Sequence, residues 1–366
     1  MLNIAFRADA STIIGSGHIM RSLTLAHQLA SDGAKITFLT RQHTGNLIDL
    51  ISSFGYQVFS LSPPKSAIKQ LNTDTWLGYS QQEDADECIA KIRKGELIDF
   101  LIVDHYAIDK TWHQQLRPFC RKIMVIDDLA NRKYDCDILL DQTLNRHKVD
   151  YLPYIPEQCQ LLLGKNYMLL RKEFSLTREK AEKKHKIDND KTPANILVSM
   201  GGGDPDNLTL LAIHALMKLK QNVSELSATI IMSSKAEFVS DIAAEIKHHS
   251  WLSLIIDGQN ISTLMLNASI AIGASGSTAW ERCCLGLPCI TLISAENQLT
   301  IAENLATEQA IINLGWHKNI TPDMLANSIN DLLKDKNKYN FMVQQCLSCC
   351  DGLGVEKVFN EVFTNV

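Results

Sequence analysis

The chain has 366 residues, of which 45% are hydrophobic and 21% are charged, and its formal net charge is −5. This composition is typical of a globular protein, and the length predicts two domains rather than one. The negative charge argues against a general nucleic-acid binder, because such proteins present a basic surface to the phosphate backbone.

Residues 1–7 contain no long apolar run of the kind found in signal peptides, and no segment approaches the roughly 18–20 apolar residues that span a membrane. We therefore expect a cytoplasmic protein without stable membrane association. Ten cysteines are present. Only Cys346, Cys349 and Cys350 have ligand-like spacing, and no second pair of cysteines or histidines accompanies them. We expect reduced thiols and no metal site.

The first half of the chain alternates short apolar segments with amphipathic ones, which predicts a parallel sheet covered by helices on both faces. The first expected helix is His18–Ser31, because apolar residues recur on one of its faces and Gly33 follows its end. The expected strands are 3–8, 35–40, 57–61, 100–103, 122–127, 137–140 and 160–163.

Polar residues gather where the first strand meets this helix. Arg7 and Asp9 stand at the end of the strand, and Gly15-Ser16-Gly17 leads to His18 in the first helical turn. The positive end of the helix dipole disfavours a protonated ring there, so His18 could act as a general base; it could also cap the helix or bind phosphate. Position 20 is Met and not the glycine of a dinucleotide-binding fingerprint, which argues against a nicotinamide-dependent dehydrogenase.

Asp104, His105 and Tyr106 end another apolar strand. They could bind the hydroxyl and amide groups of a ligand, Asp104 could orient His18, or its carboxylate could simply cap the loop. Asp127-Asp128 and Asp141-Gln142 repeat the pattern at two further strand ends, where we expect a carboxylate to cap the next helix.

Residues 171–191 carry many charges, which is typical of a solvent-exposed helix followed by a linker. A second series of strands follows at 195–200, 228–232, 252–256, 269–272 and 289–293. We therefore predict an α/β fold of two Rossmann-like domains, whose parallel sheets face a cleft. The domains would be 1–175 and 194–366, joined by a linker at 176–193.

Two loops of small residues follow strands of the second domain. In the first, Gly201, Gly202 and Gly203 allow the backbone to approach a phosphate or ribose, and Pro205 fits the first helical position with Asp204 as the N-cap. The second loop, Ser275-Gly276-Ser277, opens a helix whose N-terminus can bind an anion.

Glu281 lies one turn further on, where a carboxylate can accept hydrogen bonds from a vicinal diol such as that of ribose. Glu296-Asn297-Gln298 ends the next strand and could bind sugar hydroxyls or N-acetyl groups, or cap a helix. Together these segments indicate a site for a nucleotide diphosphate.

With these segments, the chain resembles almost end to end the hydrolases of UDP-2,4-diacetamido-2,4,6-trideoxy-β-L-altropyranose in the pseudaminic acid pathway, which is associated with flagellin glycosylation. These hydrolases are similar to the lipid-linked N-acetylglucosaminyltransferase of peptidoglycan synthesis, so the resemblance implies a GT-B architecture. It also implies a monomer that needs no cofactor and no metal, whose partners are the UDP-sugar and water.

The resemblance assigns roles to residues as well. It implies that His18 is the base, that Glu281 binds ribose, and that Ser275, Gly276 and Ser277 bind phosphate. Further expected binding residues are Gly17, Arg21, Gly201, Gly202, Gly203, Asn297 and Gln298. Residues expected to contact the sugar or to support the base are Arg7, Asp9, Asp104, His105 and Tyr106.

The expected reaction is a single inverting displacement, in which His18 takes a proton from water and UDP leaves from the opposite face of the sugar. Two alternatives remain open: a GT-B glycosyltransferase with a UDP-N-acetylated sugar donor, and a nucleotide-sugar binding protein without turnover. A nucleotide-sugar 2-epimerase is a third, which requires acid and base groups on both faces of the sugar.

Overall fold

The computed structural model describes residues 1–69, 72–92, 97–187, 194–201 and 203–364, apart from the side chains of residues 186, 187 and 297. Gly202 and residues 188–193 of the expected linker therefore lie outside the described part of the chain. The chain divides into two units, Met1–Leu169 with Leu353–Val366, and Leu170–Gly352.

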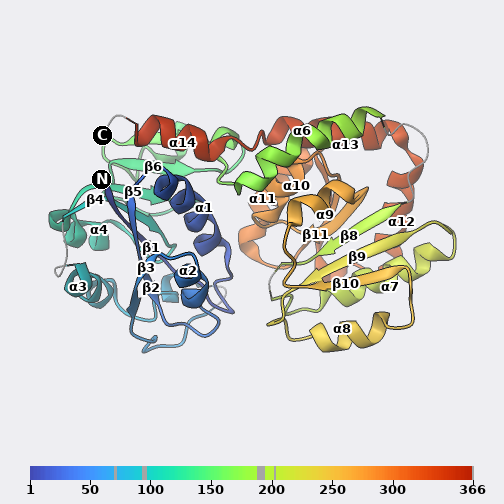
Figure 1. Ribbon diagram of the computed structural model, residues 1–366, viewed down its shortest axis with the longest axis horizontal. Helices are drawn as coiled ribbons and strands as arrows, with labels where there is room; N and C mark the ends of the chain where they lie inside the picture. The colour runs from blue at the N-terminus through green and yellow to red at the C-terminus, as the bar shows by residue number, and fades with distance from the viewer. Residues whose placement is uncertain (70–71, 93–96, 188–193, 202, 365–366) are drawn as a thin grey trace. The chain divides into compact units, whose positions relative to one another are not determined.

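The first unit contains a seven-stranded sheet in the order β3-β2-β1-β4-β5-β6-β7, and every pairing in it is parallel (Figure 1). Its strands are β1 (Asn3–Ala8), β2 (Lys35–Arg41), β3 (Gln57–Leu61), β4 (Ile98–Asp104), β5 (Cys120–Ile126), β6 (Ile138–Asp141) and β7 (Gln160–Leu163). Its helices are α1 (Gly17–Ser31), α2 (Ile48–Ser53), α3 (Gln81–Ile92), α4 (Lys110–Leu116), α5 (Lys148–Tyr151) and α14 (Gly354–Val362).

Both faces of this sheet are buried, as the short apolar strands predict. Alternate residues of β1 point to opposite faces, so Ile4 and Phe6 share a core with α1 and α14, whereas Ala5 joins a core with α3 and α4. Arg7 has the same orientation as Ala5 and is fully buried. The strand therefore delivers a guanidinium into the interior beneath α3, where it must find carboxylate partners.

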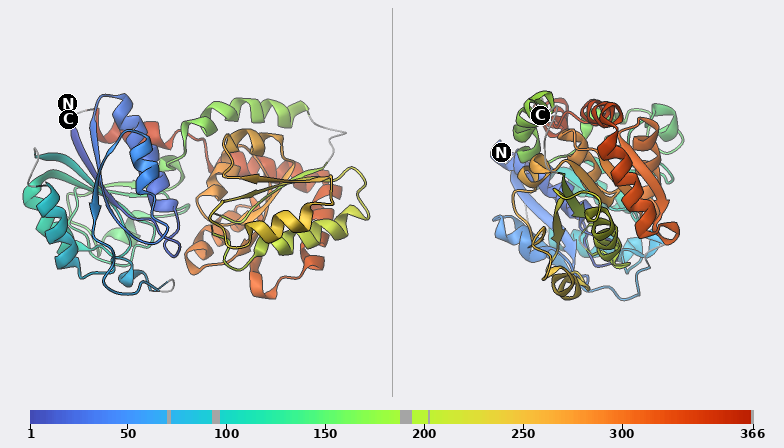
Figure 2. Two further views of the ribbon diagram at one scale, coloured as in Figure 1. Left: turned by 60° about the horizontal axis from the view of Figure 1, so that its bottom comes forward. Right: turned by 90° about the vertical axis from the view of Figure 1, so that its right-hand side faces the viewer.

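The second unit contains a six-stranded sheet in the order β10-β9-β8-β11-β12-β13, again parallel throughout (Figure 2). Its strands are β8 (Asn195–Ser199), β9 (Ser227–Met232), β10 (Leu252–Ile256), β11 (Ile270–Ala274), β12 (Cys289–Ile293) and β13 (Ile311–Trp316). Its helices are α6 (Lys172–Ile187), α7 (Leu208–Lys220), α8 (Val239–Ile246), α9 (Ile261–Asn267), α10 (Thr278–Cys284), α11 (Leu299–Thr307), α12 (Pro322–Lys334) and α13 (Lys336–Cys349).

The strand β13 is absent from the sequence prediction, because Asn313 and Gly315 interrupt its apolar run. Short 3-10 turns complete the chain at Thr73–Thr75, Arg117–Phe119, Lys165–Tyr167, Glu296–Gln298 and His317–Asn319.

The division of the chain differs from the expected boundaries in two respects. The charged segment forms α6, which is part of the second unit and begins only three residues after the division at Leu169. The C-terminal segment returns to the first unit, where α14 lies beside α1 and Phe363 packs on Phe100 with ring centroids 4.7 Å apart (Figure 1). Local sequence patterns do not indicate this return, because an amphipathic helix fits either unit.

Gly354 begins the returning helix in a place that has no room for a side chain. A Cβ atom at this position would lie 2.2 Å from the backbone oxygen and 2.4 Å from the backbone nitrogen of Met168. The glycine therefore allows the start of α14 to pass directly against the backbone of Met168, near the end of the segment Met1–Leu169.

We expect Gly354→Ala to destabilise the protein by about 1–3 kcal/mol, because a methyl group would overpack against rigid backbone. The measurement is urea unfolding followed by circular dichroism. Asn360→Ala, at an exposed position of the same helix, is the control and should change the unfolding free energy by less than about 0.5 kcal/mol. Equal stability of the two variants would contradict the packing argument.

Candidate functional site

The first cluster of polar residues lies at the carboxyl ends of β1 and β4. These strands pair in the register Ala8↔Asp104, which brings Asp104 next to the point where the chain leaves β1 for α1. His18 lies in the first turn of α1 and is 6% exposed. Parallel pairing therefore brings together two residues that are 86 positions apart in the sequence.

Asp104 fixes the state of the His18 ring. The Nδ1 atom of His18 lies 2.6 Å from Oδ1 of Asp104. Because an ionised carboxylate only accepts, Nδ1 carries the hydrogen and Nε2 presents its lone pair. The ring also contacts Tyr106 edge-on at 4.5 Å and Trp76 at 6.1 Å between centroids, so its plane is held by packing as well as by the hydrogen bond.

Arg21 holds this carboxylate from the next turn of α1. Its Nε and Nη2 atoms donate to the two oxygens of Asp104 at 2.6 and 2.7 Å, and its Nη1 donates to both oxygens of Asp128 at 2.9 and 2.7 Å. The Tyr106 hydroxyl donates to Asp128 at 2.6 Å. The guanidinium of Arg21 is thus bound by protein carboxylates and is only 8% exposed.

The electrostatic balance keeps Asp104 ionised. Burial alone would raise the pKa of this carboxyl, but the charge of Arg21 and the hydrogen bonds with Arg21 and His18 outweigh burial and lower the pKa well below its usual range. Burial likewise opposes the charge of Arg21, but Asp104 and Asp128 raise its pKa well above the ordinary value. A permanently charged carboxylate therefore faces the Nδ1 atom of His18.

A second set of charges lies behind this site, and we call Arg7, Asp9, Arg41 and Asp84 the buried charge cluster. All four side chains are fully buried. Arg7 binds Asp9 and Asp84, each at 2.7 Å, and Arg41 also binds Asp84. The indole of Trp112 donates to Asp84 at 2.9 Å. Two positive and two negative groups neutralise each other, so Arg7 and Asp9 support the fold and do not reach the surface.

His105 belongs to this interior as well. Its Nδ1 accepts a hydrogen bond from the backbone N–H of Ala107 at 3.1 Å, and its Nε2 lies 3.3 Å from Asp9. Burial lowers the pKa of His105, although Asp9 opposes the effect. Because Nδ1 accepts a hydrogen bond, the neutral ring carries its hydrogen on Nε2, which lies close to Asp9 but outside hydrogen-bond geometry, and His105 supports the loop that follows β1.

Two of the strand-end aspartates cap turns, whereas the sequence pattern predicts that they cap the helices that follow. Asp127 accepts from the backbone N–H groups of Leu129 and Ala130, and Asp141 accepts from that of Thr143. The Tyr151 hydroxyl lies 2.7 Å from Asp127 and 2.6 Å from Asp141. One hydroxyl hydrogen cannot serve two ionised acceptors at once, so this bridge favours a proton on a carboxyl.

The raised pKa of Asp141 agrees with a proton on a carboxyl beside the Tyr151 hydroxyl. Burial and then the charge of Asp128 raise the pKa of Asp141 to about 6, against the opposing effects of Arg146, Thr143 and Tyr151. Arg146 binds Asp141 at 2.6 Å and also donates to the backbone oxygen of Asp128 at 2.6 Å. Arg146 therefore connects the bridge that Tyr151 makes between the two aspartates to Asp128, which binds Arg21.

In the second unit, the loops after β8 and β11 begin side by side, because Gly273 pairs with Ser199. A Cβ atom on Gly273 would lie 2.6 Å from the Ser199 oxygen and 2.7 Å from Nη1 of Arg282, so only glycine fits there. Arg282 donates to the backbone oxygen of Ala274 at 2.7 Å and holds the following loop. A Cβ atom on Gly276 would contact nothing within 4 Å of the described chain.

Three polar atoms near this loop are buried without a partner in the described part of the chain: the Ser275 hydroxyl, Oε2 of Glu281 and Nε of Arg282. The other oxygen of Glu281 accepts from Arg171 at 3.0 Å. Burial raises the pKa of Glu281 although Arg171 opposes it. A carboxylate held on one oxygen and unsatisfied on the other is suited to accept hydrogen bonds from a ligand.

Asp204 caps the next helix, but the helix begins later than expected. Its carboxylate accepts from the backbone N–H groups of Leu208 and Thr209 at 2.8 and 2.9 Å. The prediction that Pro205 opens the helix is wrong, because α7 starts at Leu208 and Asp204 adopts a positive φ of 41°. Gly201 has a φ of 95°, which is a backbone conformation that favours glycine.

Gln298 lies at the start of α11, and its amide oxygen accepts from the backbone N–H of Ser294 at 3.0 Å. The side chain of Asn297 and the whole of Gly202 lie outside the described residues. Within the described ranges, no group of three or more His, Cys, Asp or Glu side chains could hold a metal ion. No helix in that part of the chain is long and apolar enough to cross a membrane.

Sequence reasoning missed Arg41, Asp84 and Arg171. Arg41 stands at the end of a predicted strand, and this polar strand end is the signal that could have found it. Asp84 lies in an acidic helix with Glu83, Asp86 and Glu87, a pattern that indicates a solvated surface, and so it carried no signal.

Comparisons with known proteins agree with the resemblance and with the fold. The chain is 29% identical over 307 residues to the UDP-2,4-diacetamido-2,4,6-trideoxy-β-L-altropyranose hydrolase of Campylobacter jejuni, covering 83% of this chain and 96% of the relative. This likeness confirms the resemblance drawn from the sequence motifs. No family model matches the chain.

Solved structures show the fold. The MurG protein of Acinetobacter baumannii superposes with a TM-score of 0.67 at 14% identity, covering 99% of both chains. The MnaA protein of S. aureus, solved with UDP, superposes with a TM-score of 0.65 at 15% identity, covering 99% of this chain and 96% of that one. These likenesses confirm two Rossmann-like domains of the GT-B type.

The protonated bridge predicts a pH dependence of stability. Because the pKa of Asp141 is raised in the folded protein, its stabilising contribution is complete below the pKa of about 4 that an unfolded aspartate has, and it is lost as the pH rises through about 6. Asn does not titrate, so Asp141→Asn is the reference. Between pH 4 and pH 7 the free energy of unfolding of the wild type should fall by on the order of 2–3 kcal/mol relative to that of this variant.

The measurement is urea unfolding of both proteins at several pH values in this range. Glu157→Gln, an exposed carboxyl of the same unit, is the matched control and should show no such difference. A stability difference between wild type and Asp141→Asn that stays constant with pH would contradict the bridge.

Proposed function

We propose that the protein is an enzyme that acts on a UDP-linked sugar, and specifically that it hydrolyses UDP-2,4-diacetamido-2,4,6-trideoxy-β-L-altropyranose in pseudaminic acid biosynthesis. The observation that carries this proposal is the oriented His18, whose Nε2 has no hydrogen-bond partner in the described chain while Asp104 holds Nδ1 at 2.6 Å. The likeness to the Campylobacter jejuni hydrolase supports the choice of substrate.

In this proposal the second unit binds the nucleotide. The open space at Gly276 and the glycine conformation at Gly201 let N–H groups approach the phosphates, together with Gly203, Ser275 and Ser277. The unsatisfied oxygen of Glu281 accepts hydrogen bonds from the ribose hydroxyls, and Arg171 keeps the carboxylate in place from its other side.

The first unit supplies the base. Nε2 of His18 takes a proton from water, the water oxygen forms a bond to the anomeric carbon, and the bond from that carbon to the UDP oxygen breaks. UDP leaves with the electron pair, so the free sugar has the inverted configuration. Asp104 stabilises the imidazolium as it forms and stays ionised because Arg21 neutralises it.

The tyrosine and aspartate around Arg21 have a positioning role. Tyr106 contacts the His18 ring and donates to Asp128, which in turn holds the far side of Arg21. A nucleotide-sugar binding protein without turnover would need neither the oriented histidine nor its ionised partner, so this arrangement favours an enzyme.

We expect His18→Asn to retain UDP binding and to lose turnover by at least about a hundredfold, which is the usual contribution of a positioned general base. Asp104→Asn should also lower kcat, because an amide can stabilise the wrong tautomer of the ring. The measurements are UDP affinity by calorimetry and steady-state release of UDP. His147→Asn, an exposed histidine at the N-cap of α5, is the control and should leave both unchanged. Near-normal turnover of His18→Asn would refute the assignment.

The reaction itself is tested with the UDP-linked altrose derivative in ¹⁸O-labelled water without an acceptor, followed by mass spectrometry of both products. Attack at carbon places the label in the free sugar, as the proposal requires. Label in UDP would show attack at phosphorus and would exclude this mechanism. Absence of turnover until an acceptor is added would favour a glycosyltransferase instead.

A further inference from the structure

Two cysteines meet where β6 and β7 begin in the first unit. The sulfur atoms of Cys136 and Cys159 are 3.6 Å apart. Cys136 precedes β6 by two residues and Cys159 directly precedes β7. The backbone N–H of Gln160 donates to the oxygen of Asp137 at 2.9 Å, so the two strand starts are fixed to each other beside the thiols.

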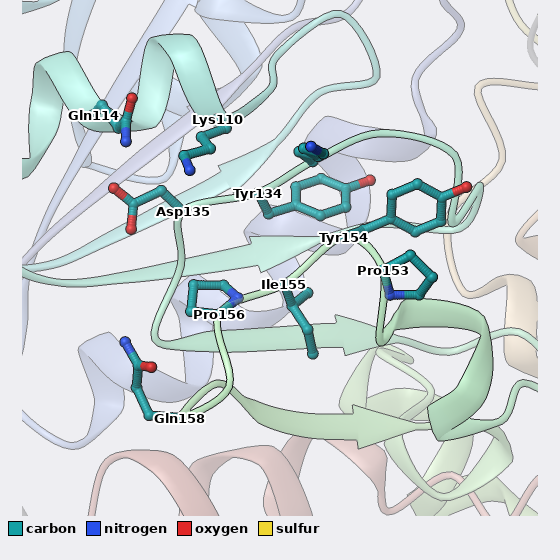
Figure 3. A pocket seen from close by; sticks show the side chains of 10 residues that line it. Lys110, Gln114, Tyr134, Asp135, Pro153, Tyr154, Ile155, Pro156 and Gln158 are labelled. Atoms are coloured by element: carbon teal, nitrogen blue, oxygen red, sulfur yellow. The ribbon is translucent and has the colours of Figure 1, made fainter.

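The two thiols differ in access to solvent. Cys136 is 1% exposed, whereas Cys159 is partly exposed. Their sequence neighbours Asp135 and Gln158 line a surface pocket together with Lys110 and Pro156, as Figure 3 shows. Neither cysteine lines this pocket, so access to the pair rests on the partial exposure of Cys159 itself.

We propose that Cys136 and Cys159 form a redox-modification site, at which a peroxide converts the two thiols into a reversible disulfide. The Cys159 thiolate attacks one oxygen of the peroxide and becomes a sulfenic acid, and the first water molecule leaves. The sulfur of Cys136 then attacks the Cys159 sulfur, the S–S bond forms, and the sulfenic oxygen leaves as the second water. Two thiols and one hydrogen peroxide thus give one disulfide and two water molecules.

The geometry fits this order of events. Cys136 is buried and Cys159 is partly exposed, so Cys159 is the first to meet the peroxide; the hydrogen bond with Cys159 and then burial also raise the pKa of the Cys136 thiol well above its ordinary value. A disulfide has a sulfur separation of about 2.05 Å, so the two atoms must approach by roughly 1.5 Å from their 3.6 Å separation. Side-chain rotation supplies a movement of this size while the strands stay paired.

Two other thiol pairs provide an internal comparison. Cys283 interacts with Cys346, and Cys284 with Cys350, in the second unit. All four of these side chains are buried. Access to solvent therefore separates the pair at β6 and β7 from the other two, and we expect peroxide to select it.

The test uses the full-length wild-type protein, treated in the folded state with a slight excess of hydrogen peroxide. The remaining thiols are alkylated, and peptides are mapped by mass spectrometry without reduction. We expect the number of free thiols to fall from ten to eight, with a single linked pair of peptides containing Cys136 and Cys159. Treatment with dithiothreitol should restore all ten.

Two variants check the order of the steps. In Cys136→Ser, a dimedone adduct should form on Cys159, because the resolving thiol is gone. In Cys159→Ser, neither an adduct nor a disulfide should form at Cys136. Cys120→Ser, which replaces a buried cysteine outside the pair, is the matched control and should still give the disulfide.

Several results would overturn the proposal. One is a wild-type protein that keeps ten free thiols while Cys159 stays unmodified. Another is a stable dimedone adduct on wild-type Cys159 without any linked peptide, because resolution by Cys136 would then have failed. A linkage that forms first within the second unit would show that access to solvent does not select the pair. The wild-type peptide map decides between these results even if a variant fails to fold.

Discussion

A carboxylate that is removed from water stays ionised only if cations lie against it, and Asp104 imposes this requirement on the first unit. Arg21 meets it by donating to both oxygens of Asp104, and Nδ1 of His18 lies within hydrogen-bond distance of one of them. Arg21 in turn needs a second anion, which Asp128 supplies, and Asp128 is held by Tyr106. The orientation of a single imidazole ring thus depends on a chain of charges that begins at the ends of three neighbouring strands.

The buried charge cluster extends the same logic beneath the site. An ion pair in the interior gives little net stability, but loss of one partner leaves an uncompensated charge that costs about 3–5 kcal/mol. Arg7 lies between Asp9 and Asp84, and Arg41 shares Asp84, so no member can change alone without such a cost. The cluster therefore fixes the ends of β1 and β2 against α3, and the loop that leads from β1 to His18 in α1 starts from a rigid edge.

Much of the fold followed from the sequence, because short apolar strands and amphipathic helices have distinct periods. The helix after β1 and its end at Gly33 were predicted this way, and so was the position of His18 in the first turn. The pairing of Arg7 with Asp84 was not predictable, because Asp84 lies in an acidic helix whose local pattern is that of a solvated surface. The strand β13 was not predicted, because Asn313 and Gly315 interrupt its apolar run. The return of α14 depended on core space beside α1 that no local pattern reveals.

The second unit is an insertion within the first, since the chain leaves after Leu169 and re-enters at Leu353. Gly354 passes directly against the backbone of Met168, so the exit and the re-entry are neighbours. The strands of the first unit therefore emerge early from the ribosome, but their core stays open at Phe100 until Phe363 has been synthesised. The core beside Phe100 is thus completed by residues that follow the whole inserted unit in the chain.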